Sequence, residues 1–193
     1  MTDISNIKSL LDWQLLKGSH TWPGPDGGTC INEVAIVVAG CRYQEVTGPE
    51  DLPRSFSREL GILLLCLNDS LSDEHRQELK RFVLRLPGSR DSVSIEVDRM
   101  KAVRSGLVRL LAERALPTVE MATLQFGNIF ERISSAQVIA SRIAVVSESR
   151  GSAFLEAALG VIERAFEIGR KADRIDTRIV EERLAMAREP QGA

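Results

Sequence analysis

The chain has 193 residues, of which 44% are hydrophobic and 27% are charged, and its formal net charge is −2. This composition is typical of a globular protein with enough apolar material for a core, and it excludes a nucleic-acid binder that works by bulk positive charge. The longest apolar runs, 34–39 and 62–67, are far shorter than the roughly 20 residues that a membrane-spanning helix needs. We therefore expect neither a membrane partner nor a nucleic-acid partner.

The cysteine content and the start of the chain indicate a compartment. Three cysteines are present, Cys30, Cys41 and Cys66, and none has CxxC spacing. The first residues contain no basic segment followed by an apolar run, so no secretory signal is expected. An odd number of cysteines without such a signal indicates free thiols in a reducing environment. The predicted location is the cytoplasm.

Apolar residues recur at helical spacing through most of the chain, which predicts a mainly α-helical fold. For the second helix, the β-branched run at 35–38 leaves a buried strand as the alternative. Thr29 as N-cap, with Glu33 one turn later, favours the helix. In the first half we expect helices over 4–16, 29–39, 57–67 and 72–86, with a connector over 41–55.

The second half is predicted to contain longer amphipathic helices, over 93–111, 118–133, 137–146, 152–169 and 175–184. Residues 93–97 also alternate between apolar and polar, so a short strand at that point is an alternative. The Pro-Gly-Ser sequence at 87–89 marks the best internal boundary. We therefore divide the chain into a compact helical module, 1–88, and a helical region, 89–193, that packs on it or forms one continuous domain with it.

Chemically capable side chains concentrate in a glycine- and proline-rich loop, 18–28, and in the start of the helix after it. This stretch contains His20, Trp22, Cys30 and Glu33. A thiol in the first turn of a helix meets the positive end of the helix dipole, which lowers its pKa, and His20 can serve as its base. One interpretation is thus an enzyme with Cys30 as thiol nucleophile. The other is that Cys30 is a small buried residue, as free cysteines usually are.

The same residues raise two further hypotheses. His20, Cys30 and Glu33 are legitimate zinc ligands, and Cys30 and Glu33 share one helix face, but structural zinc prefers several cysteines and catalytic zinc usually has paired histidines. The glycines at 27 and 28 suggest a phosphate loop. Neither GxxxxGK[ST] nor GxGxxG is present, and Asp26 would repel phosphate, so a tight turn is favoured.

A second polar cluster begins at the end of the third predicted helix. Asn68 and Asp69 end the apolar pattern, and Asp73, Arg76 and Gln77 follow. Asn and Asp at this place are typical turn and cap residues. Asp73 and Arg76 are three residues apart, so we expect them to form a solvated pair.

The two clusters are expected to meet. An inward-pointing Asp69 needs a hydrogen-bond donor, because an unpaired buried carboxylate is costly. The candidate donors are His20, the amides of 28–30 and Arg76. Packing of the helix after the loop on the third predicted helix would bring His20, Cys30 and Asp69 together as the candidate catalytic group.

The residues of these clusters follow the pattern GSH…DGGTC..E…LND…D..RQ…RL.G across the first half of the chain, at Gly18–His20, Gly28–Cys30 with Glu33, Leu67–Asp69, Asp73 with Arg76–Gln77, and Arg85–Gly88. In this pattern the chain resembles an uncharacterised family of bacterial helical proteins. The resemblance implies a module and a candidate site, and it implies no particular reaction.

Two functions therefore stand side by side. The first is a helical binding or assembly module in which His20, Cys30, Glu33 and Asp69 form a structural hydrogen-bond network. The second is an enzyme that uses Cys30 as nucleophile or metal ligand with His20. For the first we expect a protein partner or self-association through 152–184. That stretch has a broad apolar stripe, which we expect to be partly uncovered, at Phe154, Leu155, Ala158, Leu159, Ile162 and Phe166.

Overall fold

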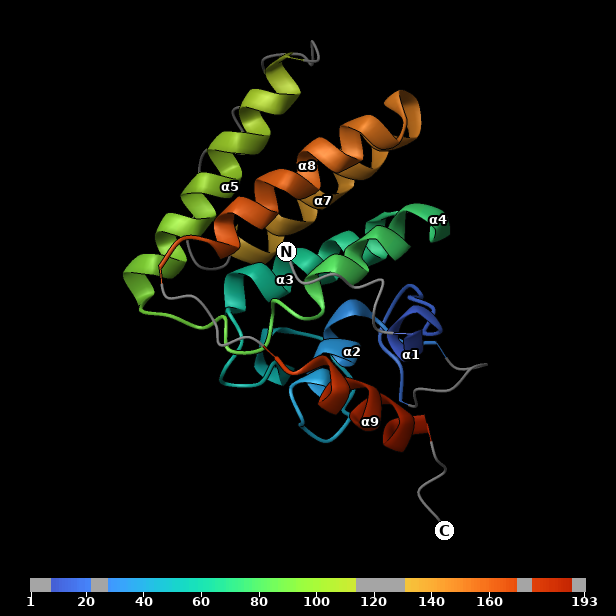
Figure 1. Cartoon of the computed structure of the whole chain (residues 1–193). Coiled ribbons are helices and arrows are strands. Elements are labelled where there is room, and N and C mark those ends of the chain that lie inside the picture. Colours follow the sequence, from blue (N-terminus) through green and yellow to red (C-terminus); the bar gives the residue numbers. More distant parts are fainter. Residues whose placement is uncertain (1–7, 22–27, 114–130, 170–174, 189–193) are drawn as a thin grey trace.

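The computed structural model of the chain is mainly α-helical, as predicted (Figure 1). It describes residues 8–21, 28–113, 131–169 and 175–188, and for 131–135 it describes the backbone alone. Within these ranges the one β-type pairing is an isolated parallel bridge between Leu15 and Thr29. The elements are α1 (Lys8–Leu11), α2 (Ile31–Val38), η2 (Pro49–Asp51), α3 (Arg58–Ser70), α4 (Asp73–Arg76), η3 (Gln77–Phe82), α5 (Val93–Glu113), α7 (Glu131–Arg150), α8 (Ser152–Phe166) and α9 (Thr177–Arg188).

The long helices α5, α7 and α8 lie together on one side of the molecule, and α1, α2 and α9 lie on the other, with α3 between them (Figure 1). Helix α3 packs on α7, and α8 packs on both α5 and α7. Helix α9 returns from the end of the chain to pack on α1 and α2. The buried apolar core therefore runs without interruption from Leu10 to Leu184, through both predicted halves.

Helix α2 is the centre of the first half, and every one of its residues is buried. It is a helix, and the alternative of a buried strand is wrong. Its N-cap is Cys30, so the predicted cap, Thr29, lies one residue outside. Its C-terminal end is a Schellman motif, in which Gly40 has a φ of +80°. The amide of Gly40 donates to Val37 O (2.9 Å) and that of Cys41 donates to Ile36 O (3.1 Å).

Two predicted helices of the first half differ from the structure. Helix α1 covers only Lys8–Leu11, because the chain then extends to pair with the segment at Thr29; residues 4–7 lie outside the described part. The predicted helix over 72–86 is the short α4 followed by the 3₁₀ segment η3. A 3₁₀ segment aligns residues three apart, and this places both Leu79 and Phe82 in the core. The predicted cap of α3 is confirmed, since Ser57 Oγ accepts from Leu60 N.

The second half follows the predicted pattern more closely. Helix α5 begins directly at Val93, so the strand alternative there is wrong. The predicted helix over 118–133 falls mostly outside the described residues, and α7 contains the predicted stretch 137–146. The N-cap position of α8 is Gly151, and Ser152, the predicted cap, is its first helical residue. Within the described ranges, no helix is both long and apolar enough to cross a membrane.

The apolar stripe of α8 is part of the core. All six of its predicted residues are buried, and the ring of Phe166 stacks on that of Phe82 with centroids 5.7 Å apart. The expectation that this stripe is left uncovered is therefore wrong, because α5 and α7 both pack against α8. Of the predicted docking region, Ile179 on α9 keeps a large exposed apolar side chain, 42% exposed.

Candidate functional site

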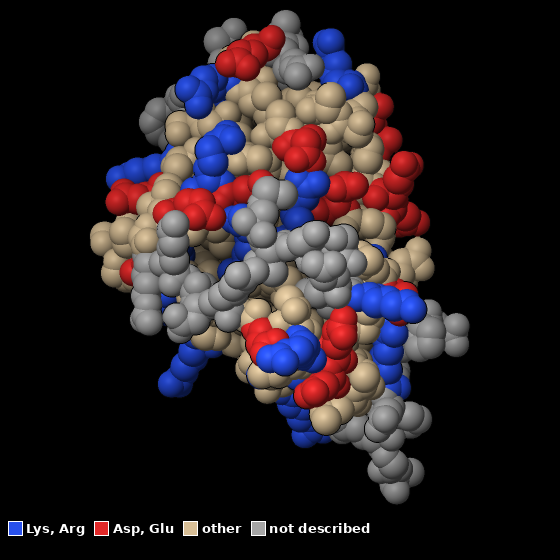
Figure 2. Space-filling view, in the orientation of Figure 1, with Lys and Arg blue, Asp and Glu red and all other residues tan. Residues whose placement is uncertain are grey.

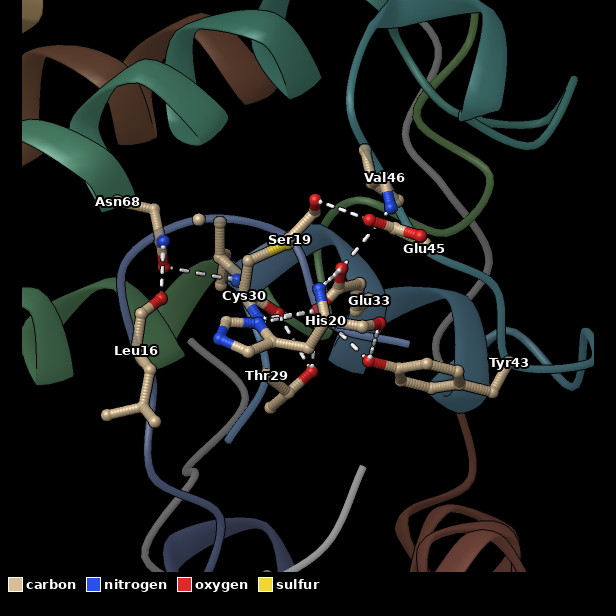
Figure 3. Close-up of polar contacts among 12 residues, drawn as sticks. Leu16, Ser19, His20, Thr29, Cys30, Glu33, Tyr43, Glu45, Val46 and Asn68 are labelled. Carbon is tan, nitrogen blue, oxygen red and sulfur yellow. Dashed lines mark hydrogen bonds and ion pairs between the residues drawn. The ribbon is translucent and has the colours of Figure 1, made fainter. Parts of the chain in front are cut away.

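Glu33 on α2 is the centre of a buried polar cluster (Figure 3). Its side chain is completely buried, and each carboxylate oxygen accepts hydrogen bonds from separate segments of the chain. Glu33 Oε1 accepts from His20 N (2.8 Å) and Val46 N (3.2 Å), and Oε2 accepts from Cys30 N (2.7 Å), Tyr43 Oη (3.1 Å) and Thr29 Oγ1 (3.2 Å). Five donors on one carboxylate compensate the cost of burying it.

Three contacts hold His20 in place, two of them to Glu33 and one to Tyr43. Besides the main-chain bond, its ring Nδ1 lies 3.3 Å from Glu33 Oε2, and its carbonyl oxygen accepts from Tyr43 Oη (2.8 Å). The imidazole is 16% exposed. In the described part of the chain, no hydrogen bond joins His20 to Cys30. The partner of His20 is thus the carboxylate of Glu33, and the predicted thiol–imidazole pair is not formed.

Cys30 occupies the N-cap position of α2 and is completely buried. It forms a capping box with Glu33, which binds the Cys30 amide and so closes the first turn. Burial and, after it, the negative charge of Glu33 raise the pKa of the Cys30 thiol well above its ordinary value. The hypothesis that the helix dipole lowers this pKa is therefore wrong, because desolvation outweighs the dipole, and the alternative interpretation of Cys30 as a small buried residue is confirmed.

Asp69 belongs to an adjoining set of contacts at the end of α3. Its Oδ1 accepts from Gly18 N (2.9 Å) and from Asn68 Nδ2 (3.2 Å). Asn68 Nδ2 also donates to Leu16 O (2.8 Å), and its Oδ1 accepts from Ile31 N (3.3 Å). The donors expected for Asp69 were His20, the amides of 28–30 and Arg76, and the observed donors are others. Within the described residues, Asp69 is not hydrogen-bonded to His20 or Cys30. The two clusters are neighbours joined through the backbone of the loop at 16–20.

Arg76 binds the C-terminal end of α3, and Gln77 binds the backbone of the residue just before the loop at 16–20. The guanidinium of Arg76 is 3% exposed and binds Leu71 O (2.7 Å), Asn68 O and Asp73 Oδ1. The expectation of a solvated pair is wrong for this arginine, because it satisfies carbonyls at the C-terminal end of α3. Gln77 pairs with the backbone of Leu15, accepting from its N (3.1 Å) and donating to its O (2.9 Å), as a neighbouring strand would.

Gly28 shows why the loop needs glycine where it rejoins the core. Its φ is +62°, and a Cβ added to it would lie 2.1 Å from Leu16 Cδ1. The positive φ that was predicted here is confirmed at Gly28. Trp22, Asp26 and the glycine at 27 lie outside the described residues.

The donor set does not fit a zinc ion. In the described ranges, no group of three or more His, Cys, Asp or Glu side chains is arranged to hold a metal. Both oxygens of Glu33 already accept from N–H and O–H groups, and a zinc-bound Cys30 would have to be a thiolate. The set His20, Cys30 and Glu33 is better described as a closed hydrogen-bond network.

Sequence reasoning missed two members of the network, Tyr43 and Val46. Both fall in the segment 41–55, which reads as a connector, and an amide donor such as Val46 N leaves no signal in a sequence. Tyr43 is the single tyrosine of the chain. Burial and the charge of Glu33 raise the pKa of its hydroxyl above its ordinary value, so it acts as a hydrogen-bond donor.

No family model, curated protein or solved structure matches this chain. The resemblance to the bacterial family therefore stays a prediction based on the motif residues. The structure assigns an intramolecular contact to most of these residues, buried as between Cys30 and Glu33 or exposed as between Ser19 and Glu45.

Proposed function

We propose that this chain is a helical binding module in which His20, Cys30, Glu33 and Asp69 form a structural network. The observation that carries the proposal is the saturation of Glu33. Its carboxylate accepts from the loop at 20, from 29–30, and from 43 and 46. A general base or ligand needs a free lone pair directed at a substrate, whereas these bonds connect four segments of the chain to one another.

The burial of Cys30 favours this proposal over a thiol enzyme. A nucleophilic cysteine needs an exposed site and a lowered pKa, and Cys30 has the opposite of both. Native labelling with iodoacetamide, followed by peptide mass spectrometry, tests the assignment. We expect Cys41, the exposed cysteine, to react first and Cys30 to react only as fast as the protein opens. Rapid alkylation of Cys30 at mildly acidic pH would restore the enzyme hypothesis.

We place the contact with a protein partner at the start of α9, around Ile179. This side chain is the exposed apolar residue that remains in the predicted docking region, and charged residues surround it at Asp176, Arg178 and Glu182. An apolar centre with a charged rim is the usual composition of a protein interface. On the face that Figure 2 shows, Lys and Arg alternate with Asp and Glu, which suits a protein partner better than a nucleic acid.

The substitution Ile179→Glu tests this contact, with Val138→Glu on α7 as the matched control, because their exposures are 42% and 38%. Both variants should keep the circular dichroism spectrum of the unchanged protein. Cross-linking with mass spectrometry should show partner or self cross-links near α9 that Ile179→Glu removes and Val138→Glu keeps. Light scattering then separates a second copy from a different protein. Equal cross-linking in all three proteins would rule out this surface.

The family and the location form part of the same proposal. The motif pattern supports membership of the bacterial family, and three unpaired cysteines support a reducing cytoplasm.

A further inference from the structure

We propose that a hollow between the turn after α2 and helix α9 binds a small organic anion. The hollow has a volume of about 320 Å³. Cys41, Arg42 and Tyr43 line it on the side of the turn, and Arg183 and Met186 line it on the side of α9. Its volume is at the lower end of the range for small-molecule sites, about 300–1,000 Å³. The proposal goes beyond the binding module and does not depend on the contact at Ile179.

The charge of the hollow selects an anion. Among the described residues, Arg42 and Arg183 line it and no acidic residue does. In the part of the chain that the structure describes, Arg42 makes no ion pair or hydrogen bond, so its charge is not compensated there. A guanidinium presents a planar fork of N–H donors that matches a carboxylate or a phosphate.

Arg183 is held in place before any ligand arrives. It donates to Val38 O at the end of α2. Its guanidinium also lies close over Gly40, where an added Cβ would be 2.9 Å from Arg183 Cζ. The other carbonyls at this helix end accept from the amides of Gly40 and Cys41, so the negative end of the α2 dipole is largely satisfied. A fixed cation loses little entropy when it binds an anion.

The other residues that line the hollow suit a ligand with an apolar group attached to its charged group. Met186 is 69% exposed, and Val37 lies beside it in the lining. The ring of Tyr43 is anchored because its hydroxyl binds Glu33 and the carbonyl of His20 (Figure 3). An aromatic or branched carboxylate or phosphate ester would place its oxyanion on the arginines and its body against these side chains.

Cys41 supplies a reporter, because it is exposed and lines the hollow. We expect benzoate or phenyl phosphate to slow alkylation of Cys41 by iodoacetamide, and benzamide, a neutral molecule of the same shape, to leave the rate unchanged. Inorganic phosphate has an oxyanion but no apolar group. Its effect on the alkylation rate therefore separates binding by the arginines from binding by the apolar walls. Protection by phenyl phosphate alone identifies a phosphate ester, and protection by benzoate identifies a carboxylate.

In the variant Arg42→Gln, a roughly tenfold higher concentration of benzoate or phenyl phosphate should be needed for the same protection of Cys41. This is the effect expected for the loss of a hydrogen bond to a charged group. The matched control is Arg178→Gln, an arginine of α9 outside the hollow. A second measurement needs no ligand. The ratio of Cys41 reaction rates with an anionic and a neutral aromatic disulfide should fall in Arg42→Gln and stay unchanged in Arg178→Gln. The proposal would be overturned if benzamide protected Cys41 as well as the anions do. It would also be overturned if the ratio of reaction rates with the two disulfides were the same in Arg42→Gln as in the unchanged protein.

Discussion

The two sides of the molecule are stabilised in different ways. Around α2, segments without regular structure are held by buried hydrogen bonds that converge on Glu33 and on Asn68. In the group α5, α7 and α8, apolar stripes pack against one another, and the hydrogen bonds stay mostly within each helix. Under the proposed function, the reactive residue types gathered around α2 hold loops in place. Loops need directional partners, whereas helices satisfy their own backbones.

The comparison is tested most strongly by Glu33→Gln, which keeps the shape of the side chain but replaces an acceptor with a donor. An amide N–H₂ in this position would face other donors, so we expect a loss of about 4 kcal/mol in the free energy of unfolding. Urea denaturation measures it. Glu156→Gln on α8 is the matched control, because Glu156 is exposed and paired with Arg81; its loss should stay below about 1 kcal/mol. Similar losses in both variants would contradict a special role for Glu33.

On the apolar side, Leu159→Ala should lower the free energy of unfolding by about 3 kcal/mol, through lost burial and the cavity left behind. Leu159 is fully buried on α8. Urea denaturation and light scattering check it together. We expect the particle mass to stay constant, since this residue lies in the core. A fall in mass with unchanged stability would show that Leu159 lies in an interface.

Alkaline pH should destabilise the protein through a buried thiol on α3, Cys66. Burial raises the pKa of the Cys66 thiol from its ordinary 9.0 to about 11, and Asp69 adds to this. Above pH 9 the unfolded chain releases this proton while the folded chain keeps it. Stability should therefore fall as the pH rises from about 9 to about 11, with Cys66 alone contributing up to about 1.4 kcal/mol per pH unit. Urea midpoints across this range measure the slope, which Cys66→Ala should reduce and Cys41→Ala should leave alone.

The smallest expected effect is that of Tyr43→Phe. It removes one hydroxyl that bonds to Glu33 and to the carbonyl of His20, and Glu33 keeps its other donors. We expect a loss of about 1 kcal/mol by urea denaturation. The pH dependence should also flatten slightly, because the pKa of Tyr43 is raised in the folded protein. A loss as large as that of Glu33→Gln would place the centre of the network at Tyr43.

Periodicity was sufficient to predict α2, α3, α5 and α8, but neither the course of 72–86 nor the network. The stripe on α8 and the cap at Ser57 follow local rules, so the sequence predicts them. The 3₁₀ course of η3 depends on tertiary packing, which no local pattern contains. Glu33 was recognised as a capable side chain, yet its role depends on amides at 20, 30 and 46, and every residue except proline has one. Burial reversed the expected pKa of Cys30, and burial is a property of the whole fold.

The return of α9 to the start of the chain has a consequence for biosynthesis. Arg188 stacks over the indole of Trp13, 5.2 Å from the ring centroid, and donates to Ser9 O. These contacts join residues far apart in the sequence; Ser9 and Arg188 are 179 positions apart. While the ribosome is still adding the second half, the apolar face of α1 and α2 that α9 covers stays open to water and to chaperones. The side of the molecule that contains α1 and α2 is therefore completed only once α9 has been synthesised.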